Sequence, residues 1–419
     1  MKHLLLIAVM LAVCICPLAA QTRADAPVDS TADSHGTDWQ VSLLTCAPGA
    51  VFYELEGHSG LRIRSAQRGV DEVINWGIFD FNSPGFVWRY VKGDMNYLAG
   101  SVPAQYFSRE YEHEGRAVTE QLLNLTPEQA ERVVALVVEN LRPENRVYAY
   151  NYVTDNCSTR PLSIIERAVG DTLALGAPGG DMAGVASFRD AMRFYHRNYP
   201  WYQFGIDICL GSTIDRDEAP RAMAFAPVAL SRMIATATLP DGSPLVADTT
   251  MFVDGDAAGR GSGPTPWYLT PMFWSIVVLL VTLAVTLYDV SAGRMSRGFD
   301  VVMFTVFGLA GCLVTFLWFF SAHTASSPNW LLLWLNPLCL LPLFMVWTKG
   351  LRRLLLWWQI INFVALIGLC VVFVVGIQAC NGAFIPLIVS DMVRSLFFIF
   401  YVRCFNPTSR VHQPLLYRR

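Results

Sequence analysis

The chain has 419 residues, of which 53% are hydrophobic, and 31 Lys and Arg against 34 Asp and Glu give a net charge of −3. A charge so close to zero, with no basic tail of low complexity, argues against a protein that binds nucleic acid through a cationic surface. Charged residues occur throughout the first part of the chain, up to about residue 265, whereas long apolar runs dominate the remainder. The length predicts two or three domains.

The N-terminal segment has the pattern of a secretory signal peptide. In "MKHLLLIAVMLAVCICPLAA" the basic Lys2 precedes an apolar run that ends in small residues. We expect the signal peptide to occupy residues 1–26, with cleavage after Ala20 or after Ala26. An uncleaved membrane anchor is the alternative.

Residues 38–255 are expected to form a globular domain of mixed structure. Apolar and polar residues alternate in "WQVSLLTCAP", across residues 49–81 and in "FVWRYVKGDMNYLAGSV", which predicts strands. A helix is expected in "LTPEQAERVVALVVENLRPENR", where Thr126 can cap the helix and Pro127 suits its first position. A second helix is expected in "CSTRPLSIIERAVG" and a third before Pro200, and "PDGS" predicts a hairpin turn.

A linker rich in Gly and Pro, residues 256–267, leads into an expected membrane domain at residues 268–419. Five apolar stretches are long enough to cross the hydrocarbon core of a bilayer as helices. The third contains Pro337 and Pro342, so we expect it to be kinked or partly re-entrant. The stretches are 271–289, 301–321, 330–348, 354–377 and 383–402.

The loops between these stretches predict the orientation of the chain. "SAGRMSRGFD", "TKGLRRL" and the C-terminal tail carry Lys or Arg, whereas "SAHTASSPNW" and "QACNGAF" carry neither. The positively charged side is expected to be cytoplasmic. Five spans then place residues 38–255 outside the cytoplasm, in agreement with the signal peptide.

Three cysteines lie outside the signal peptide and the apolar stretches: Cys46, Cys157 and Cys209. Cysteines tend to pair in an oxidising compartment, but three cannot all pair within one domain. Either Cys46 and Cys209 form a disulfide and leave Cys157 free, or none of the three is paired.

Cys157, in "YNYVTDNCSTR", stands where a short strand gives way to a helix. The free N–H groups and the dipole at a helix N-terminus are expected to lower the pKa of a thiol placed there. The same N–H groups can stabilise the oxyanion of an acyl tetrahedral intermediate. Cys157 is therefore a candidate nucleophile, and a buried structural cysteine is the alternative.

His58, in "EGHSGLRIR", is the candidate base. If its strand pairs with "DEVINWGIF" through a turn near Gln67, Asn75 lies diagonally across on the same face. Asn75 can then accept a hydrogen bond from the imidazole and orient it. The alternatives for this third position are Glu54, Glu56 and Asp155.

Candidate substrate-binding residues fall into two groups. Arg64 and Arg160 are basic residues near the proposed cleft and can contact a phosphate head group. Asp391 and Arg394 are three residues apart in the fifth apolar stretch and can pair on one helix face. His323, with Asn329, Asn336 and Asn381, is expected to gather at the periplasmic ends of the spans, where these residues can line an acyl or head-group site. For the polar membrane residues, contact between helices and anchoring at the interface are the favoured roles.

A histidine on a strand followed by a cysteine at the start of a helix resembles the order in the circularly permuted papain-like, or NlpC-type, fold. More closely, "LLTCAPGAVFYELEGHSGLRIR", "NWGIFDFNSPGFVWRYVKGDMNYLAG" and "PENRVYAYNYVTDNCSTRPLSIIE" resemble the N-terminal periplasmic domain of the Lnb family of Bacteroidota. The five apolar stretches also fit that family. The resemblance implies an α+β protein: a circularly permuted papain-like periplasmic domain followed by an all-α membrane domain of about five transmembrane helices.

The resemblance further implies an apolipoprotein N-acyltransferase of the cell inner membrane, with His58 and Cys157 matching the catalytic pair. The acyl donor would be a phospholipid and the acceptor a diacylated lipoprotein with a free N-terminal α-amine. A thioester on Cys157 would carry the acyl chain between them, with no metal or organic cofactor. Two alternatives are a membrane-anchored NlpC-type cysteine peptidase or amidase acting on cell-wall peptides, and a non-catalytic sensor or assembly protein.

Overall fold

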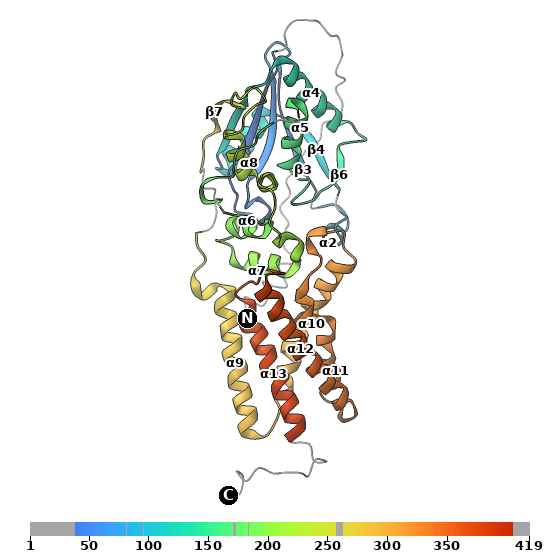
Figure 1. Ribbon diagram of the computed structural model, residues 1–419. Helices are drawn as coiled ribbons and strands as arrows, with labels where there is room; N and C mark the ends of the chain where they lie inside the picture. Colours follow the sequence, from blue (N-terminus) through green and yellow to red (C-terminus); the bar gives the residue numbers. More distant parts are fainter. Residues whose placement is uncertain are drawn as a thin grey trace.

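The computed structural model of the chain describes residues 38–404 except 81, 95, 171–172, 183 and 257–262. The expected signal peptide, residues 1–26, lies outside the described residues. Figure 1 shows a sheet-containing domain stacked end to end on a bundle of long helices. The mixed α+β domain followed by a helical membrane region is thus as predicted.

The described part of the first domain contains a seven-stranded sheet in the order β6-β4-β3-β2-β1-β5-β7. Every neighbouring pair in this order is antiparallel, so a short turn can join β2 to β3 directly. The strands are β1 Gln40–Cys46, β2 His58–Ser65, β3 Val70–Ile78, β4 Asn96–Pro103, β5 Val118–Leu123, β6 Val147–Ala149 and β7 Val246–Val253.

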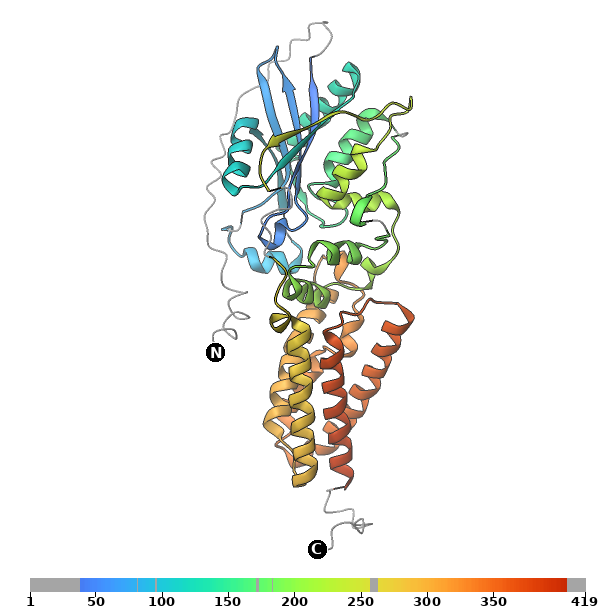
Figure 2. The same cartoon turned by 90° about the vertical axis from the view of Figure 1, so that its left-hand side faces the viewer.

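Helices cover both faces of the sheet (Figure 2). On one face, α4 (Pro127–Leu141), α5 (Thr159–Val169) and α8 (Pro227–Ala235) pack on alternate strand residues such as Leu61 and Trp76. On the other face, α3 (Ala104–Glu114) packs on β1, β3, β5 and β7. Thr126 caps α4 as expected, since its hydroxyl accepts from the Gln129 N–H.

One expected strand is partly a helix. The first half of "FVWRYVKGDMNYLAGSV" forms α2 (Phe86–Lys92), and β4 begins only at Asn96. Gly85 and Gly93 bracket α2 with backbone φ angles of 68° and 74°, a conformation that glycine adopts without a steric penalty. The two glycines at the ends of α2 thus favour a helix, although the aromatic residues between them have a preference for β-strands.

In its described residues, the membrane domain contains four long apolar helices and one broken span. The third expected span divides into Thr324–Leu333 and Pro337–Met345, which meet at an angle of 47°. Pro337 starts the second piece and cannot donate a backbone hydrogen bond, which explains the predicted break. The long helices are α9 Pro271–Ala292, α10 Arg297–Phe319, α12 Arg352–Val375 and α13 Phe384–Cys404, with the short α11 Leu341–Met345 in the broken span.

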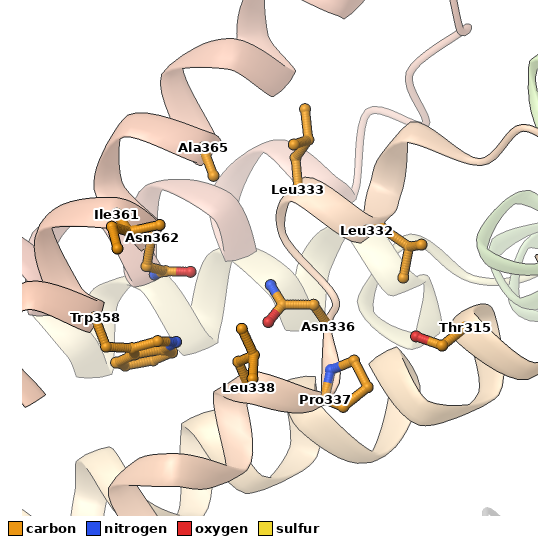
Figure 3. Close-up of a pocket in the computed structure, with 10 residues that line it drawn as sticks. All are labelled: Thr315, Leu332, Leu333, Asn336, Pro337, Leu338, Trp358, Ile361, Asn362 and Ala365. Carbon is orange, nitrogen blue, oxygen red and sulfur yellow. The ribbon is translucent and has the colours of Figure 1, made fainter. Parts of the chain in front are cut away.

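The broken span packs closely on α10. A Cβ atom on Gly311 would lie 2.4 Å from the backbone nitrogen of Asn336, so no larger residue fits there without a shift. Beside the break is a mainly apolar cavity of about 320 Å³. Figure 3 shows the side chains of Asn336 and Asn362 pointing towards each other within it.

Two groups of contacts fix the sheet domain on the membrane helices. Beyond the end of α10, the Ala322 N–H donates to the Lys92 carbonyl over 2.8 Å, and the His323 Nε2 lies 2.7 Å from the Tyr90 carbonyl oxygen. Figure 1 shows α6 (Phe188–Tyr195) and α7 (Pro200–Cys209) at the same junction. There the Asn381 amide donates to the Asp207 carboxylate over 2.8 Å.

The three cysteines of the sheet domain are all unpaired. Cys46 lies buried in β1, Cys209 ends α7, and Cys157 precedes α5. The structure therefore corresponds to the alternative in which no disulfide forms, and the Cys46–Cys209 pair is not present.

The expected pairing of Asp391 with Arg394 is wrong. Arg394 instead contacts Asp300 of α10 at 2.5 Å and Asp289 of α9 at 2.9 Å. Asp391 accepts from the Asn362 amide of α12 over 2.7 Å. The spacing on one helix allows a pair, but two carboxylates on neighbouring helices satisfy the buried guanidinium better, so both residues join helices to one another.

His323, Asn329 and Asn381 lie at the junction between the sheet domain and the membrane helices, at the ends of the spans where they were expected. Asn329 bonds to the Ile208 carbonyl and to Gln378, and Asn381 bonds to Asp207, so both contact the end of α7. His323 lies under α2, whereas Asn336 lines the cavity beside the break. These contacts join the elements of the two domains to one another.

We predict that Arg394→Ala destabilises the protein by roughly 3–5 kcal/mol, because it leaves two buried carboxylates unpaired. Denaturant unfolding in detergent micelles measures the loss. In double-mutant cycles, Arg394→Ala should couple strongly with Asp300→Ala and only weakly with Asp391→Ala. Stronger coupling with Asp391 would contradict the contacts described above.

Candidate active site

His58 is the first residue of β2, and the nearby Phe52 ring packs on the Tyr202 ring of α7, with centroids 5.8 Å apart, at the junction with the membrane helices. The preceding Gly57 has a φ of 85°, and a Cβ atom there would lie 2.5 Å from the carbonyl oxygen of Cys46. Only glycine fits this turn without strain. The turn therefore delivers the imidazole to a fixed place beside β1, where His58 pairs with Cys46.

Asn75 orients His58. Asn75 pairs with Gly60 across β2 and β3, which puts its side chain diagonally opposite His58, and its Oδ1 lies 3.0 Å from the His58 Nε2. The Asn75 amide nitrogen faces the Val73 carbonyl at 3.5 Å, so Oδ1 is the atom presented to the imidazole. Nε2–H then donates to Oδ1, and the lone pair of the imidazole lies on Nδ1.

Asn156 builds the loop that carries Cys157. Its Oδ1 accepts from the N–H groups of Ser158 and Thr159 over 2.8 and 2.9 Å, at the start of α5. Its amide nitrogen donates to the carbonyls of Tyr152 and Phe225. Because Asn156 occupies these two helix N–H groups, they are not available to the thiol as the sequence suggested.

The loop and β2 meet next to the two candidate residues. The hydroxyls of Ser59 and Ser158 lie 3.4 Å apart and both serines are fully buried. The Ser59 N–H and the Tyr150 hydroxyl lie near the Cys157 thiol and lower its pKa. Ser59, which follows His58 in the chain, thus lies against both Cys157 and Ser158. This contact brings His58, Asn75 and Cys157 to one end of the sheet.

Burial sets the protonation of both candidate groups. It lowers the pKa of His58 to about 4, even though the bond to Asn75 raises it. Burial raises the pKa of Cys157 to about 11, although the Ser59 N–H lowers this pKa. The charge of Glu56 raises it further. The thiol and the imidazole are therefore both neutral at pH 7, the opposite of the lowered thiol pKa expected from the helix terminus.

The other expected residues either lie elsewhere in the molecule or are already paired with neighbouring side chains. Arg160 is held by Asp155 at 2.6 Å with its guanidinium over the Tyr148 ring, and Glu54 contacts Arg116. Arg64 lies near the far end of β2, six residues or roughly 20 Å from His58. Asp391 and Arg394 are buried among the membrane helices, and His323 lies at the junction under α2.

Sequence reasoning missed several polar residues around the thiol. Tyr150 was not proposed, although Tyr148, Tyr150 and Tyr152 alternate directly before Cys157. The part of the chain that the structure describes contains no group of three or more His, Cys, Asp or Glu side chains arranged to hold a metal ion. The site thus consists of a thiol, an imidazole and an amide in a buried, tyrosine-rich setting.

Comparison with known protein families gives two matches. Residues 28–187 match the Lnb N-terminal periplasmic domain, and residues 264–403 match the Lnb transmembrane domain. No curated protein and no solved structure matches the chain. The first match contains His58, Asn75 and Cys157, and the second contains the four long helices and the broken span.

The match to the periplasmic domain falls in the sheet domain, and the match to the transmembrane domain falls in the helical bundle that follows it along the chain. The chain therefore belongs to the Lnb family and is a multi-pass membrane protein with a periplasmic domain.

Proposed function

We propose that the protein is an apolipoprotein N-acyltransferase, which moves an acyl chain from a phospholipid to the N-terminal α-amine of a diacylated lipoprotein. The observation that carries this proposal is the meeting of the His58 and Cys157 segments, where the Ser59 and Ser158 hydroxyls lie 3.4 Å apart and Asn75 holds the His58 imidazole at 3.0 Å. Family membership supports an acyltransferase of this kind. In this proposal residues 38–255 form the catalytic domain, 256–267 the linker and 268–419 the membrane domain.

In the first half of the proposed reaction, Cys157 attacks an ester carbonyl of the phospholipid while Nδ1 of His58 takes the thiol proton. The new carbon–sulfur bond gives a tetrahedral intermediate. Its collapse breaks the carbon–oxygen bond, and the leaving glycerol oxygen takes the proton from His58. The products are a thioester on Cys157 and a lysophospholipid.

In the second half, the neutral α-amine of the lipoprotein attacks the thioester carbonyl. A carbon–nitrogen bond forms, the carbon–sulfur bond breaks, and His58 moves the amine proton to the departing sulfur. The N-acylated lipoprotein leaves and the neutral thiol and imidazole are restored. A neutral resting pair suits a cleft that must admit acyl chains, because neither group holds a solvation shell that the lipid must displace.

The position of the site suits substrates that stay in a bilayer. The junction between the two parts of the molecule exposes Trp88, Tyr90, Trp267 and Tyr268, residue types that favour the membrane interface. The proposed reaction takes place at the outer face of the inner membrane. Both the ester bond of a phospholipid and the lipoprotein N-terminus can reach that level.

Expression in a strain depleted of its own lipoprotein N-acyltransferase tests the proposal. We predict that the protein restores N-acylated lipoprotein N-termini, measured by mass spectrometry, and that Cys157→Ser and His58→Ala each lower the rate by roughly 10²–10⁴-fold. Asn75→Ala should cost less, because the base remains and only its orientation is lost. Asn145→Ala, in an exposed loop, is the matched control.

An inserted protein that yields no N-acylated product would refute the transferase, and release of acetylated or peptidic cell-wall fragments instead would favour the peptidase or amidase. Near-full activity of Cys157→Ser would refute the thioester.

The neutral resting pair makes a separate prediction. With a thiol pKa of about 11, the alkylation rate of Cys157 should rise about tenfold per pH unit between pH 7 and pH 10. Peptide mass spectrometry after timed iodoacetamide treatment measures this rate at Cys157 alone. A rate that is already constant across this range would show a preformed thiolate–imidazolium pair.

A further inference from the structure

A carboxylate that the proposed mechanism does not use lies beside the thiol. Glu56 stands two residues before His58 and only 8% of its surface is exposed. Its Oε1 is buried and has no hydrogen-bond partner. The charge of Glu56 is close enough to Cys157 to raise the pKa of the thiol further than burial alone does.

The Nε2 of His196 lies 3.5 Å from this oxygen. The Nδ1 of His196 lies 2.8 Å from the Oε1 of Gln203, which accepts the Nδ1 proton, so the Nε2 lone pair is directed to Glu56. Nε2 is likewise buried without a hydrogen-bond partner. Oε1 and Nε2 are therefore two acceptor atoms 3.5 Å apart, and neither is satisfied.

Tyrosine side chains lie around Glu56 and His196. The Tyr152 hydroxyl interacts with Glu56, and the Tyr202 ring packs edge-on against the His196 ring with centroids 4.8 Å apart. Burial raises the pKa of Tyr150, Tyr152, Tyr195 and Tyr202, and the Glu56 charge raises each further. The carboxylate thus lies among four tyrosines, a setting of the kind that binds ammonium groups.

Burying a carboxylate oxygen without a hydrogen-bond partner costs free energy, and the Glu56 charge opposes a thiolate at Cys157. Both costs are removed when a cation with several N–H donors binds beside Oε1 and Nε2 and donates to each. A primary ammonium has three such donors, one each for Glu56 and His196 with one left over.

We propose that Glu56 and His196, with the surrounding tyrosines, form the binding site for the primary α-ammonium of the acceptor. This inference rests on the proposed acyl transfer, since it names how the second substrate of that reaction is recognised. The ammonium gives one proton to the Glu56–His196 pair, from which the proton returns to solvent. The resulting neutral amine attacks the thioester, and its second proton passes through His58 to the sulfur of Cys157.

Separating the two half-reactions tests this site. The full-length protein and its Glu56→Gln variant, in detergent micelles, are first incubated with a phospholipid of defined acyl chain, and the acyl-enzyme is measured by intact mass. A synthetic diacylglyceryl-cysteine peptide with a free N-terminus is then added, and loss of the acyl group is timed. Neutral hydroxylamine replaces the peptide in a parallel reaction.

We predict that Glu56→Gln forms the acyl-enzyme at the rate of the unaltered protein or up to about threefold faster, because its removed charge no longer opposes a thiolate at Cys157. Transfer to the peptide should fall roughly 10- to 100-fold in kcat/KM, the range expected for the loss of a charge-assisted hydrogen bond. Cleavage by neutral hydroxylamine should be unchanged. Glu166→Gln, which removes a carboxylate of an ion pair on α5, is the matched control and should leave both half-reactions unchanged.

The thermal midpoint separates this role from a structural one. Glu56→Gln should unfold at the same temperature as the unaltered protein or higher, because it removes an unpaired buried charge. A lower midpoint with normal transfer to the peptide would show a structural Glu56–His196 ion pair and overturn the inference. Equal slowing with hydroxylamine would also overturn it, since Glu56 would then act on the thioester. Failure of the unaltered protein to become acylated would refute the proposed transferase and this inference with it.

Discussion

The close contact between the start of β2 and the loop before α5 is the constraint on which the site depends. Ser59 and Ser158 meet inside the protein, and each is the chain neighbour of a candidate catalytic residue. Asn156 holds its loop through four hydrogen bonds, two to the start of α5 and two to carbonyl groups elsewhere in the domain. Residues about a hundred positions apart in the sequence are thereby fixed side by side.

Burial at this contact has a chemical consequence. It keeps the thiol and the imidazole neutral in the free protein, so charge separation occurs only when a substrate arrives. The same burial leaves the Glu56 carboxylate without a full set of partners. A site with a neutral nucleophile and an unsatisfied anion suits one apolar substrate and one cationic substrate, which are the two that the proposed reaction joins.

Several features could be predicted from the sequence because they depend on local patterns. Thr126 and Pro127 marked the start of α4, Pro337 marked the break in the third span, and alternation along β2 and β3 placed Asn75 diagonally opposite His58.

Other features depend on partners distant in sequence. The spacing of Asp391 and Arg394 allowed a pair, but only the packing of α9 and α10 shows that Asp289 and Asp300 take the guanidinium. Similarly, the helix start at Cys157 predicted a lowered thiol pKa, since nothing local showed that Asn156 occupies the helix N–H groups.

The measurement that tests the account most directly is the covalent state of Cys157 after contact with lipid. The purified protein would be incubated with a phospholipid carrying one isotopically labelled acyl chain, with no acceptor present, and its peptides would be analysed by mass spectrometry. The account predicts a single labelled acyl group on Cys157, bound as a thioester that hydroxylamine removes, together with an equal amount of lysophospholipid. Label on another residue, or lysophospholipid formed while Cys157 remains unmodified throughout, would contradict it.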